Sequence, residues 1–352
     1  MTSSARILVT GANGQVGHEL LRALATTAQV PDPHPPLRGT LSRRERGSTV
    51  NLRGAGVRVR TGEVIPATRS GECSSPLLLG EGVRVRACEA LDLADLDGLR
   101  AALDRIAPDL VINAAAYTAV DRAEDEPGLA QRVNGDATGV IGAWAARHGS
   151  RVVHYSTDYV FDGNAKRAYR EDDAAHPVGA YGRSKLAGET ALRESGARFL
   201  IFRSAWVYAA RGHNFMRSML KLAAERDSLR VVDDQIGAPT PARLIAEATA
   251  RVVAQWCGDD AATRDGVYHL VASGQTSWCG FARAIFERAW HAGLLARAPQ
   301  VQAIGTVDYP TKAMRPAWSV LDTTKLRDTF GVPLPDWQIA LDGVIDELAA
   351  AG

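Results

Sequence analysis

A tyrosine and a lysine four residues apart are the first side chains in this sequence that could do chemistry together. Tyr181 and Lys185 lie in the string Tyr-Gly-Arg-Ser-Lys, at the start of an amphipathic stretch. On a helix this spacing places both side chains on one face, one turn apart. A phenol has a pKa near about 10 in model peptides, and neighbouring cations favour the phenolate. The pair therefore predicts carbonyl or alcohol redox chemistry, with Tyr181 as proton donor at a lowered pKa.

A second polar string follows a buried apolar run. Residues 152–155 predict a parallel strand, and the string Ser156-Thr157-Asp158-Tyr159 comes at its end. Doubly wound sheets bind their ligands at the carboxyl ends of the strands. We expect the hydroxyl of Thr157 to hold the carbonyl oxygen of a substrate there and to stabilise its developing negative charge.

A glycine-rich turn joins the first apolar run, residues 7–9, to the first amphipathic stretch. The first glycine permits a tight turn, the second lets backbone amides approach a pyrophosphate, and the third allows close packing of helix on strand. The helix N-terminus then offers unpaired N–H groups to the phosphates. The turn predicts a dinucleotide site whose contacts include Gly11, Asn13, Gly14, Gln15, Val16 and Gly17.

The end of the second strand distinguishes NADPH from NADH. If residues 31–61 are an insertion, the second strand is 64–68, and Arg69 comes about twenty residues after the last glycine of an uninterrupted chain. NAD enzymes place a carboxylate there, whereas Arg69 and Ser70 suit a 2′-phosphate. We therefore expect NADPH, with NADH also accepted, and we expect Asp92 and Leu93 to contact the adenine.

The elements that must position these residues alternate regularly. Short apolar runs alternate with amphipathic stretches, which predicts an α/β fold with a doubly wound, Rossmann-type parallel sheet. The expected strands are 7–9, 110–112, 152–155 and 200–202, and the expected helices of this part are 15–25, 96–106, 129–147 and 180–193. Later helices are expected at 215–225, 241–256, 281–292 and 339–349.

The chain divides into two domains in this interpretation. Residues 1–205 bind the dinucleotide, and 206–352 mainly form a smaller substrate domain, with 233–256 and 266–272 returning to the first. We interpret 31–61 and 73–86 as insertions, whose repeated Val-Arg-Val-Arg segments, 57–60 and 83–86, could pair as a hairpin.

Composition excludes several classes of protein. The net charge of +1 gives no reason to expect nucleic acid or an anionic membrane as partner. No apolar run reaches the length of a membrane span, and no signal peptide precedes the first strand. The four cysteines lack metal-site spacing and predict neither zinc nor a disulfide framework, which fits the cytoplasm.

Several of these motifs, taken in order, resemble the extended short-chain dehydrogenase/reductase superfamily and, more narrowly, the dTDP-4-dehydrorhamnose reductase family. The resemblance rests on the glycine-rich turn, Ser156-Thr157, Tyr181 with Lys185, and the segments 113–124, 206–208 and 234–240. It covers the chain from residue 7 to about residue 348, apart from the two suspected insertions. It implies NADPH-dependent reduction of the C4 ketone of dTDP-4-dehydro-L-rhamnose, the last step in making dTDP-L-rhamnose for cell-surface polysaccharide.

The resemblance also implies site residues. Cofactor and sugar would be lined by Ala114, Ala115, Ala116, Thr118 and Val120. Trp206 would pack on the sugar, and its polar groups would meet Tyr159, Asn214, Gln235 and Arg315.

Some members of the family are magnesium-bridged dimers. Glu19 matches one acidic ligand of that site, but Arg243 takes the place of another, so we predict no metal and a monomer or weak homodimer.

Two other functions stay open. A nucleotide-sugar dehydratase would need an Asp-Glu pair after Thr157, whereas Asp158 is followed by Tyr159; an epimerase is harder to exclude. The other function is that of a non-catalytic subunit, like the regulatory β subunit of methionine adenosyltransferase. The intact Thr157, Tyr181 and Lys185 argue against it.

Overall fold

A computed structural model describes residues 5–26, 63–73, 84–257 and 264–351 of the chain. Among these residues, no helix has the length and apolar character that a membrane crossing requires. Residues 31–61, the first suspected insertion, and the segment 57–60 of the suggested hairpin lie outside the described ranges.

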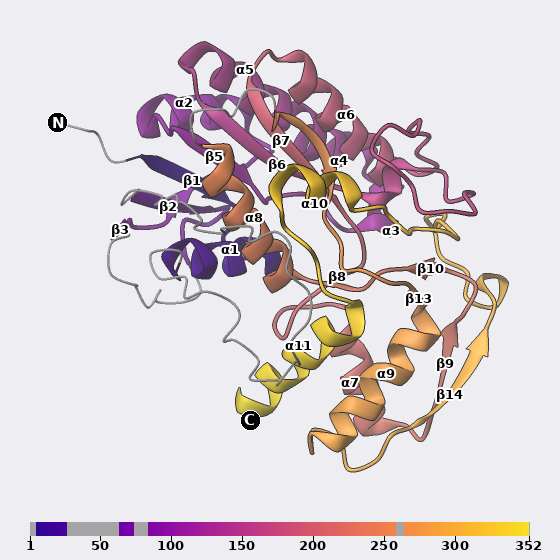
Figure 1. The fold of residues 1–352 in the computed structure, drawn as a ribbon. Coiled ribbons are helices and arrows are strands. Elements are labelled where there is room, and N and C mark those ends of the chain that lie inside the picture. The colour runs from indigo at the N-terminus through magenta and orange to yellow at the C-terminus, as the bar shows by residue number, and fades with distance from the viewer. Residues whose placement is uncertain (1–4, 27–62, 74–83, 258–263, 352) are drawn as a thin grey trace, which may run out of the picture.

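A parallel sheet forms the centre of the molecule (Figure 1). Its strand order is β12-β7-β6-β5-β1-β2-β3, and β4 also pairs with β2. The strands are β1 (Arg6–Thr10), β2 (Glu63–Thr68), β3 (Arg84–Val85), β4 (Glu89–Ala90), β5 (Leu110–Asn113), β6 (Arg151–Thr157), β7 (Arg198–Ser204) and β12 (Gly266–His269). The four expected strands and the expected second strand are confirmed, each extended by one or more residues, as is the doubly wound parallel fold.

Helices cover both faces of the sheet (Figure 1). On one face α1 (Gln15–Thr26) packs against α8 (Ala242–Trp256), and both share a core with β1. On the other lie α2 (Leu96–Ile106), α5 (Ala137–His148) and α6 (Ala180–Glu194). Apolar side chains are buried on both faces of each central strand, which is why those runs are continuous rather than alternating.

The prediction of one continuous α-helix over residues 129–147 is wrong, because a π-helical turn interrupts it. This stretch consists of α4 (Pro127–Gln131), a π-helical turn (Arg132–Asp136) and α5. In the π turn the Asn134 side chain accepts from the backbone N–H of Tyr117 and donates to its carbonyl and to Ser184 Oγ. These bonds tie the loop after β5, with the short α3 (Val120–Ala123), to α6.

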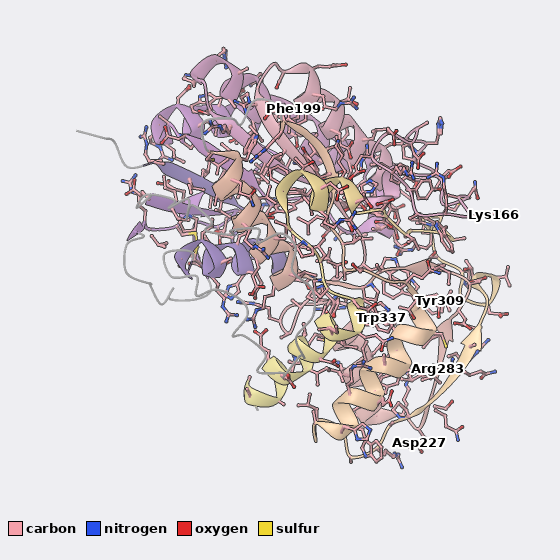
Figure 2. The ribbon with its side chains drawn as sticks, viewed as in Figure 1. Lys166, Phe199, Asp227, Arg283, Tyr309 and Trp337 are labelled. Carbon is pink, nitrogen blue, oxygen red and sulfur yellow. A yellow bond between two sulfur atoms is a disulfide. The ribbon has the colours of Figure 1, made fainter. Side chains whose placement is uncertain are left out.

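A smaller part of the molecule lies beyond the carboxyl edge of the sheet (Figure 1). Its helices are α7 (Phe215–Glu225), α9 (Trp278–His291) and α11 (Trp337–Ala351), and β9 (Ser228–Val232) pairs with β14 (Gln300–Ile304). Figure 2 shows Trp337 at the start of α11, where its ring centroid lies 6.0 Å from that of Phe281 on α9. Short connecting elements are β8 (Val207–Tyr208), β10 (Ile236–Gly237), β11 (Thr240–Pro241), β13 (Thr276–Ser277) and α10 (Thr324–Phe330).

The cysteines give a second correction. Cys73 and Cys88 are paired in a disulfide, although the sequence indicated none, because their separation of 15 residues matches no framework pattern. The last residues of β2, Ala67 and Thr68, pair with β4, and the loop after β2 folds back so that the Thr68 hydroxyl lies at both the Glu72 carbonyl and the Cys88 sulfur. The two cysteines therefore meet beside Thr68. Cys257 and Cys279 are free thiols.

Candidate active site

A cavity of about 1690 Å³ lies at the carboxyl edge of the sheet. Sites for one drug-sized ligand run to about 1,000 Å³, so this cavity has room for a dinucleotide and a second ligand. Most residues expected at the site line it: Gly11, Asn13, Gly14, Gln15, Val16, Arg69, Ser70, Asp92, Leu93, Ala114, Ala115, Ala116, Thr118, Val120, Tyr159, Tyr181, Lys185, Trp206, Asn214 and Arg315. Gly17, Thr157 and Gln235 are not among the lining residues.

Two glycines of the glycine-rich turn are packed directly against neighbouring backbone. Gly11 has a φ of +67°, and a Cβ there would lie 2.7 Å from the backbone nitrogen of Ala115. A Cβ on Gly17 would lie 2.1 Å from the carbonyl oxygen of Gly11, so no larger residue fits where α1 packs on the turn. Gly17 therefore acts through packing, and the open N-terminus of α1 faces the cavity with Gly14 and Gln15.

Arg69 and Ser70 follow β2 at the rim of the cavity. The Arg69 side chain is 84% exposed and donates from Nε to Asp92 Oδ2 at 3.0 Å. The loop after β2 is bound to the glycine-rich turn, because Asn13 Nδ2 donates to the carbonyl of Glu72 at 2.7 Å. The sequence predicted that Asp92 contacts the adenine, and the structure adds that it is hydrogen-bonded to the arginine.

Tyr181 lies in the first turn of α6 and packs, partly buried, against Tyr159. Their ring centroids are 5.5 Å apart in an edge-to-face arrangement. Burial and the carboxylate of Asp158 raise the pKa of Tyr181 above its ordinary value of 10. The expectation of a lowered pKa is wrong for the protein alone, because burial of the phenol dominates. A protonated phenol is the form that can donate a proton.

Lys185 lies one turn further along α6, with only 2% of its surface exposed. Its ammonium donates to the carbonyl of Tyr155 at 2.6 Å, and Nζ lies 3.3 Å from His154 Nε2. Burial lowers the pKa of Lys185 to about 8, opposed by the negative charge of Glu189. The lysine therefore titrates close to neutral pH, and it lines the same cavity as the glycine-rich turn.

Thr157 contacts its neighbours rather than the cavity surface. Its hydroxyl donates to Asp158 Oδ1 at 2.9 Å, accepts from the backbone N–H of Tyr159 at 3.2 Å, and bonds the phenol of Tyr181. Asp158 is fully buried, and desolvation raises the pKa of its carboxyl to about 6, opposed by hydrogen bonds from Ser319 and Thr157. Sequence reasoning missed this role of Asp158, because only the fold shows that the carboxyl turns inward.

Trp206 forms one wall of the cavity in an unusual backbone conformation. Its φ of +49° is rare for a bulky residue and is typical of functional sites. The ring stacks on Trp278 with centroids 3.6 Å apart, and Gly237 leaves room for it, since a Cβ there would meet the indole at 2.5 Å. Trp278, on α9, has no sequence signal beyond its type.

The polar residues expected to bind the substrate differ in whether they line the cavity and in which hydrogen bonds they already make. Arg315 donates to the Tyr159 hydroxyl at 3.0 Å and to Asp121 Oδ2 at 2.5 Å, which fixes its guanidinium at the cavity. The Asn214 amide caps α7 by accepting from Arg217 N, and it also donates to Gln15 Oε1. Gln235 Nε2 donates to Thr306 Oγ1 away from the cavity lining.

The residues compared with a family magnesium site do not fit a metal. Glu19 lies 3.4 Å from Arg22, which also pairs with Glu347 at 3.3 Å, and Arg243 pairs with Glu247 at 2.8 Å. Burial raises the pKa of Glu19, which disfavours a charged ligand. Across the part of the chain that the structure describes, no group of three or more His, Cys, Asp or Glu side chains could hold a metal ion.

Comparisons with known proteins agree with this geometry. Residues 74–350 match the family model for the RmlD substrate binding domain. A dTDP-4-dehydrorhamnose reductase of Burkholderia thailandensis is 42% identical over 349 residues, which span 97% of this chain and 99% of that protein.

Two solved structures of proteins with the same name are also similar. The protein from Clostridium acetobutylicum superposes with a TM-score of 0.75 at 29% identity, covering 97% of this chain and 99% of its own. The protein from Bacillus anthracis, in complex with NADP, superposes with a TM-score of 0.74 at 26% identity, covering 98% and 100%.

Proposed function

The chain belongs to the dTDP-4-dehydrorhamnose reductase family, and we propose the route by which its own residues carry out that reaction. The reaction is the NADPH-dependent reduction of the C4 ketone of dTDP-4-dehydro-L-rhamnose to dTDP-L-rhamnose, the last step of dTDP-L-rhamnose synthesis. One observation carries the proposal: Tyr181 and Lys185 line the same cavity as the glycine-rich turn and Arg69.

The residues present fit a dinucleotide phosphate cofactor. The open N-terminal end of α1, with Gly14 and Gln15, lines the cavity and offers backbone N–H groups to a pyrophosphate, and Arg69 with Ser70 offers a cation and a hydroxyl for a 2′-phosphate. When bound, NADPH supplies the hydride that adds to the carbonyl carbon. The Lys185 ammonium donates to the Tyr155 carbonyl and also lines the cavity, where another of its N–H groups would donate to a ribose hydroxyl.

Tyr181 gives its phenolic proton to the ketone oxygen as charge develops there. The raised pKa keeps the phenol protonated until that moment. Thr157 lies within hydrogen-bonding reach of the phenol and helps to align it, and this bond opposes the effect of burial on the pKa of Tyr181. Trp206 and Arg315 shape the sugar end of the cavity.

The pH dependence of the rate should follow Lys185. The ammonium is present below its pKa of about 8 and is lost above it. We therefore expect kcat/KM to fall tenfold per pH unit on the basic side of about pH 8. Steady-state rates across that range, with NADPH and substrate saturation checked at each pH, measure this limb. A rate that stays flat well above this value would contradict the role of the ammonium.

Arg69→Ala should weaken NADPH much more than NADH. A hydrogen bond to a charged group contributes about 1.5–3 kcal/mol, so the dissociation constant of NADPH should rise by roughly one to two orders of magnitude while that of NADH stays nearly constant. Cofactor titration followed by fluorescence measures both constants.

Arg105→Ala is the matched control for Arg69. Arg105 is likewise a largely exposed arginine paired with a carboxylate, Glu89 at 3.0 Å, but it is not among the residues that line the cavity. Its substitution should change neither constant. Equal losses for the two cofactors in Arg69→Ala would place the 2′-phosphate elsewhere.

Isotope tracing tests the reaction itself. With NADPH deuterated at the transferred position and dTDP-4-dehydro-L-rhamnose as substrate, the product should carry deuterium at C4 of the sugar. Deuterium at another carbon, or none, would contradict ketone reduction at C4.

We further propose a cytoplasmic location, a monomer or weak homodimer, and NADH as a poorer cofactor. The free thiols of Cys257 and Cys279 support a reducing compartment, although the Cys73–Cys88 bond is of a kind that such compartments remove. The carboxylate–arginine pairs around Glu19 support a surface without a metal bridge.

We also propose that the two parts of the chain meet near residue 205, with α8 and β12 belonging to the dinucleotide part. The packing of α8 on α1 and the pairing of β12 with β7 support this division.

A further inference from the structure

Three side chains from neighbouring strands form a buried row that ends at Lys185. Thr10 of β1 is the register partner of Asn113 of β5, and Asn113 is the partner of His154 of β6. Side chains at paired positions of parallel strands project from the same face of the sheet. Each of the three has an exposed fraction of 2% or less.

The hydrogen bonds along this row run in one direction. The backbone N–H of Ala115 donates to Thr10 Oγ1 at 3.2 Å, and the Thr10 hydroxyl donates to Asn113 Oδ1 at 2.7 Å. Asn113 Nδ2 then lies 3.2 Å from His154 Nδ1, and His154 Nε2 lies 3.3 Å from Lys185 Nζ. Every contact up to the imidazole therefore has its donor on the Ala115 side.

The orientation of the Asn113 amide is fixed from two sides. Its oxygen accepts the single proton of the Thr10 hydroxyl, whose oxygen in turn accepts from the backbone N–H of Ala115. Its nitrogen lies 3.5 Å from Thr138 Oγ1, which has given its proton to the Asn134 carbonyl at 2.8 Å and can only accept. A reversed amide would place an oxygen against the Thr138 oxygen and leave the Thr10 proton without an acceptor.

The imidazole must then carry its proton on Nε2. Burial, and next the charge of Lys185, hold the pKa of His154 well below 6.5, so the ring is neutral. Since Nδ1 accepts from Asn113, the single proton of the neutral ring is on Nε2 and points at Lys185. A free amine can accept that proton through its lone pair, whereas an ammonium presents only donors.

We propose that Thr10, Asn113 and His154 are positioning residues of this reductase, a row that directs an Nε2–H donor at Lys185 and so favours its uncharged amine. This inference rests on the proposed function for its effect on the rate. It gives the lowered pKa of Lys185 a second cause besides burial. The row also joins the catalytic lysine to Gly11, the residue after Thr10, at the start of the dinucleotide turn.

The other charged groups around Lys185 are few. Glu189 on α6 favours the ammonium, but its charge is held by Arg203 of β7, with Nη2 2.7 Å from Oε2. From β6, the neutral His154 ring and the Tyr155 carbonyl lie within hydrogen-bond distance of Nζ.

Nuclear magnetic resonance tests the row without reference to activity. Long-range nitrogen–proton correlation spectra of 15N-histidine-labelled protein distinguish the two neutral tautomers. His154 should be in the Nε2–H form. His269 is an internal reference, because its Nδ1 lies 3.1 Å from the Asp322 carbonyl and so carries the proton, giving the opposite tautomer. His154→Phe and His269→Phe assign the two signals, and His154→Gln assigns the first if His154→Phe does not fold. An Nδ1–H tautomer at His154 would overturn the proposal.

Rates then test the consequence for Lys185. His154→Phe keeps a ring but removes the N–H donor, so the basic limb of kcat/KM should move upward by about one pH unit, toward the ordinary lysine value of 10.5. His269→Phe loses an equally buried imidazole that makes no hydrogen bond to Lys185, and the basic limb of its pH profile of kcat/KM should not move. If the ring acted only by packing, the more apolar phenylalanine would move the limb downward or leave it unchanged, and either result overturns the proposal.

The two measurements separate the two claims. An Nε2–H tautomer in a protein without reductase activity would retain the row and reject the proposed function. Reductase activity in a protein with the Nδ1–H tautomer would retain the proposed function and reject the row.

Discussion

Tyr181→Phe should bind NADPH as tightly as the native protein and yet lose turnover by a factor of about 10²–10⁴. The substitution removes one oxygen, whose proton is the one that the ketone oxygen receives. The ring keeps its packing against Tyr159, so the wall of the cavity stays in place. Single-turnover rates with saturating NADPH and substrate measure the loss, and a binding titration measures the affinity.

Tyr268→Phe is the control for losing a buried phenol. Tyr268 lies in β12, donates to the Arg264 carbonyl at 2.9 Å, and is not among the residues lining the cavity. Its substitution should leave turnover nearly unchanged. A Tyr181→Phe protein with near-native turnover would mean that another group supplies the proton.

Arg203→Leu should destabilise the protein by about 3–5 kcal/mol. Arg203 makes a bidentate ion pair with Glu189, at 2.9 Å and 2.7 Å, and the two side chains are 3% and 0% exposed. Removing the guanidinium leaves a carboxylate buried without its partner, which is far more costly than losing an exposed pair. Urea unfolding followed by circular dichroism measures the change in the free energy of unfolding.

The double variant distinguishes the cost of an unpaired buried charge from the cost of altered packing. With Glu189→Leu added to Arg203→Leu, no buried charge is left unpaired, and much of the lost stability should return. A double variant as unstable as the single one would show that the cost came from packing. Arg198→Leu is a useful comparison, because its pair with Asp265 is partly exposed and should contribute less.

The sequence predicted the parts of the fold that depend on local pattern. The first strand, the turn at Gly11 and the helix that begins at Gln15 follow from a β-branched run, a glycine and an amphipathic period. The helix α2 has its predicted bounds because Asp95 caps its start by accepting from Gly98 N. Tyr181 and Lys185 share a helix, so their common face could be predicted from spacing alone.

Features that depend on contacts between distant segments could not be predicted in this way. The π turn at 132–136 exists where Asn134 must reach both Tyr117 and Ser184. The direction of the Thr157 hydroxyl depends on Asp158 turning inward, and the row from Thr10 to Lys185 depends on the register of three strands. Asn214 has the residue type of a substrate ligand, but its place before α7 commits it to capping.

The central claim is that this site reduces a nucleotide-sugar ketone with NADPH. The most direct measurement follows NADPH oxidation by absorbance while dTDP-4-dehydro-L-rhamnose is generated by the upstream dehydratase and 3,5-epimerase. We expect oxidation that requires both upstream enzymes and yields dTDP-L-rhamnose. A folded protein that binds NADPH but does not oxidise it under these conditions would contradict the account, and would favour another nucleotide-sugar ketone or a non-catalytic binding subunit.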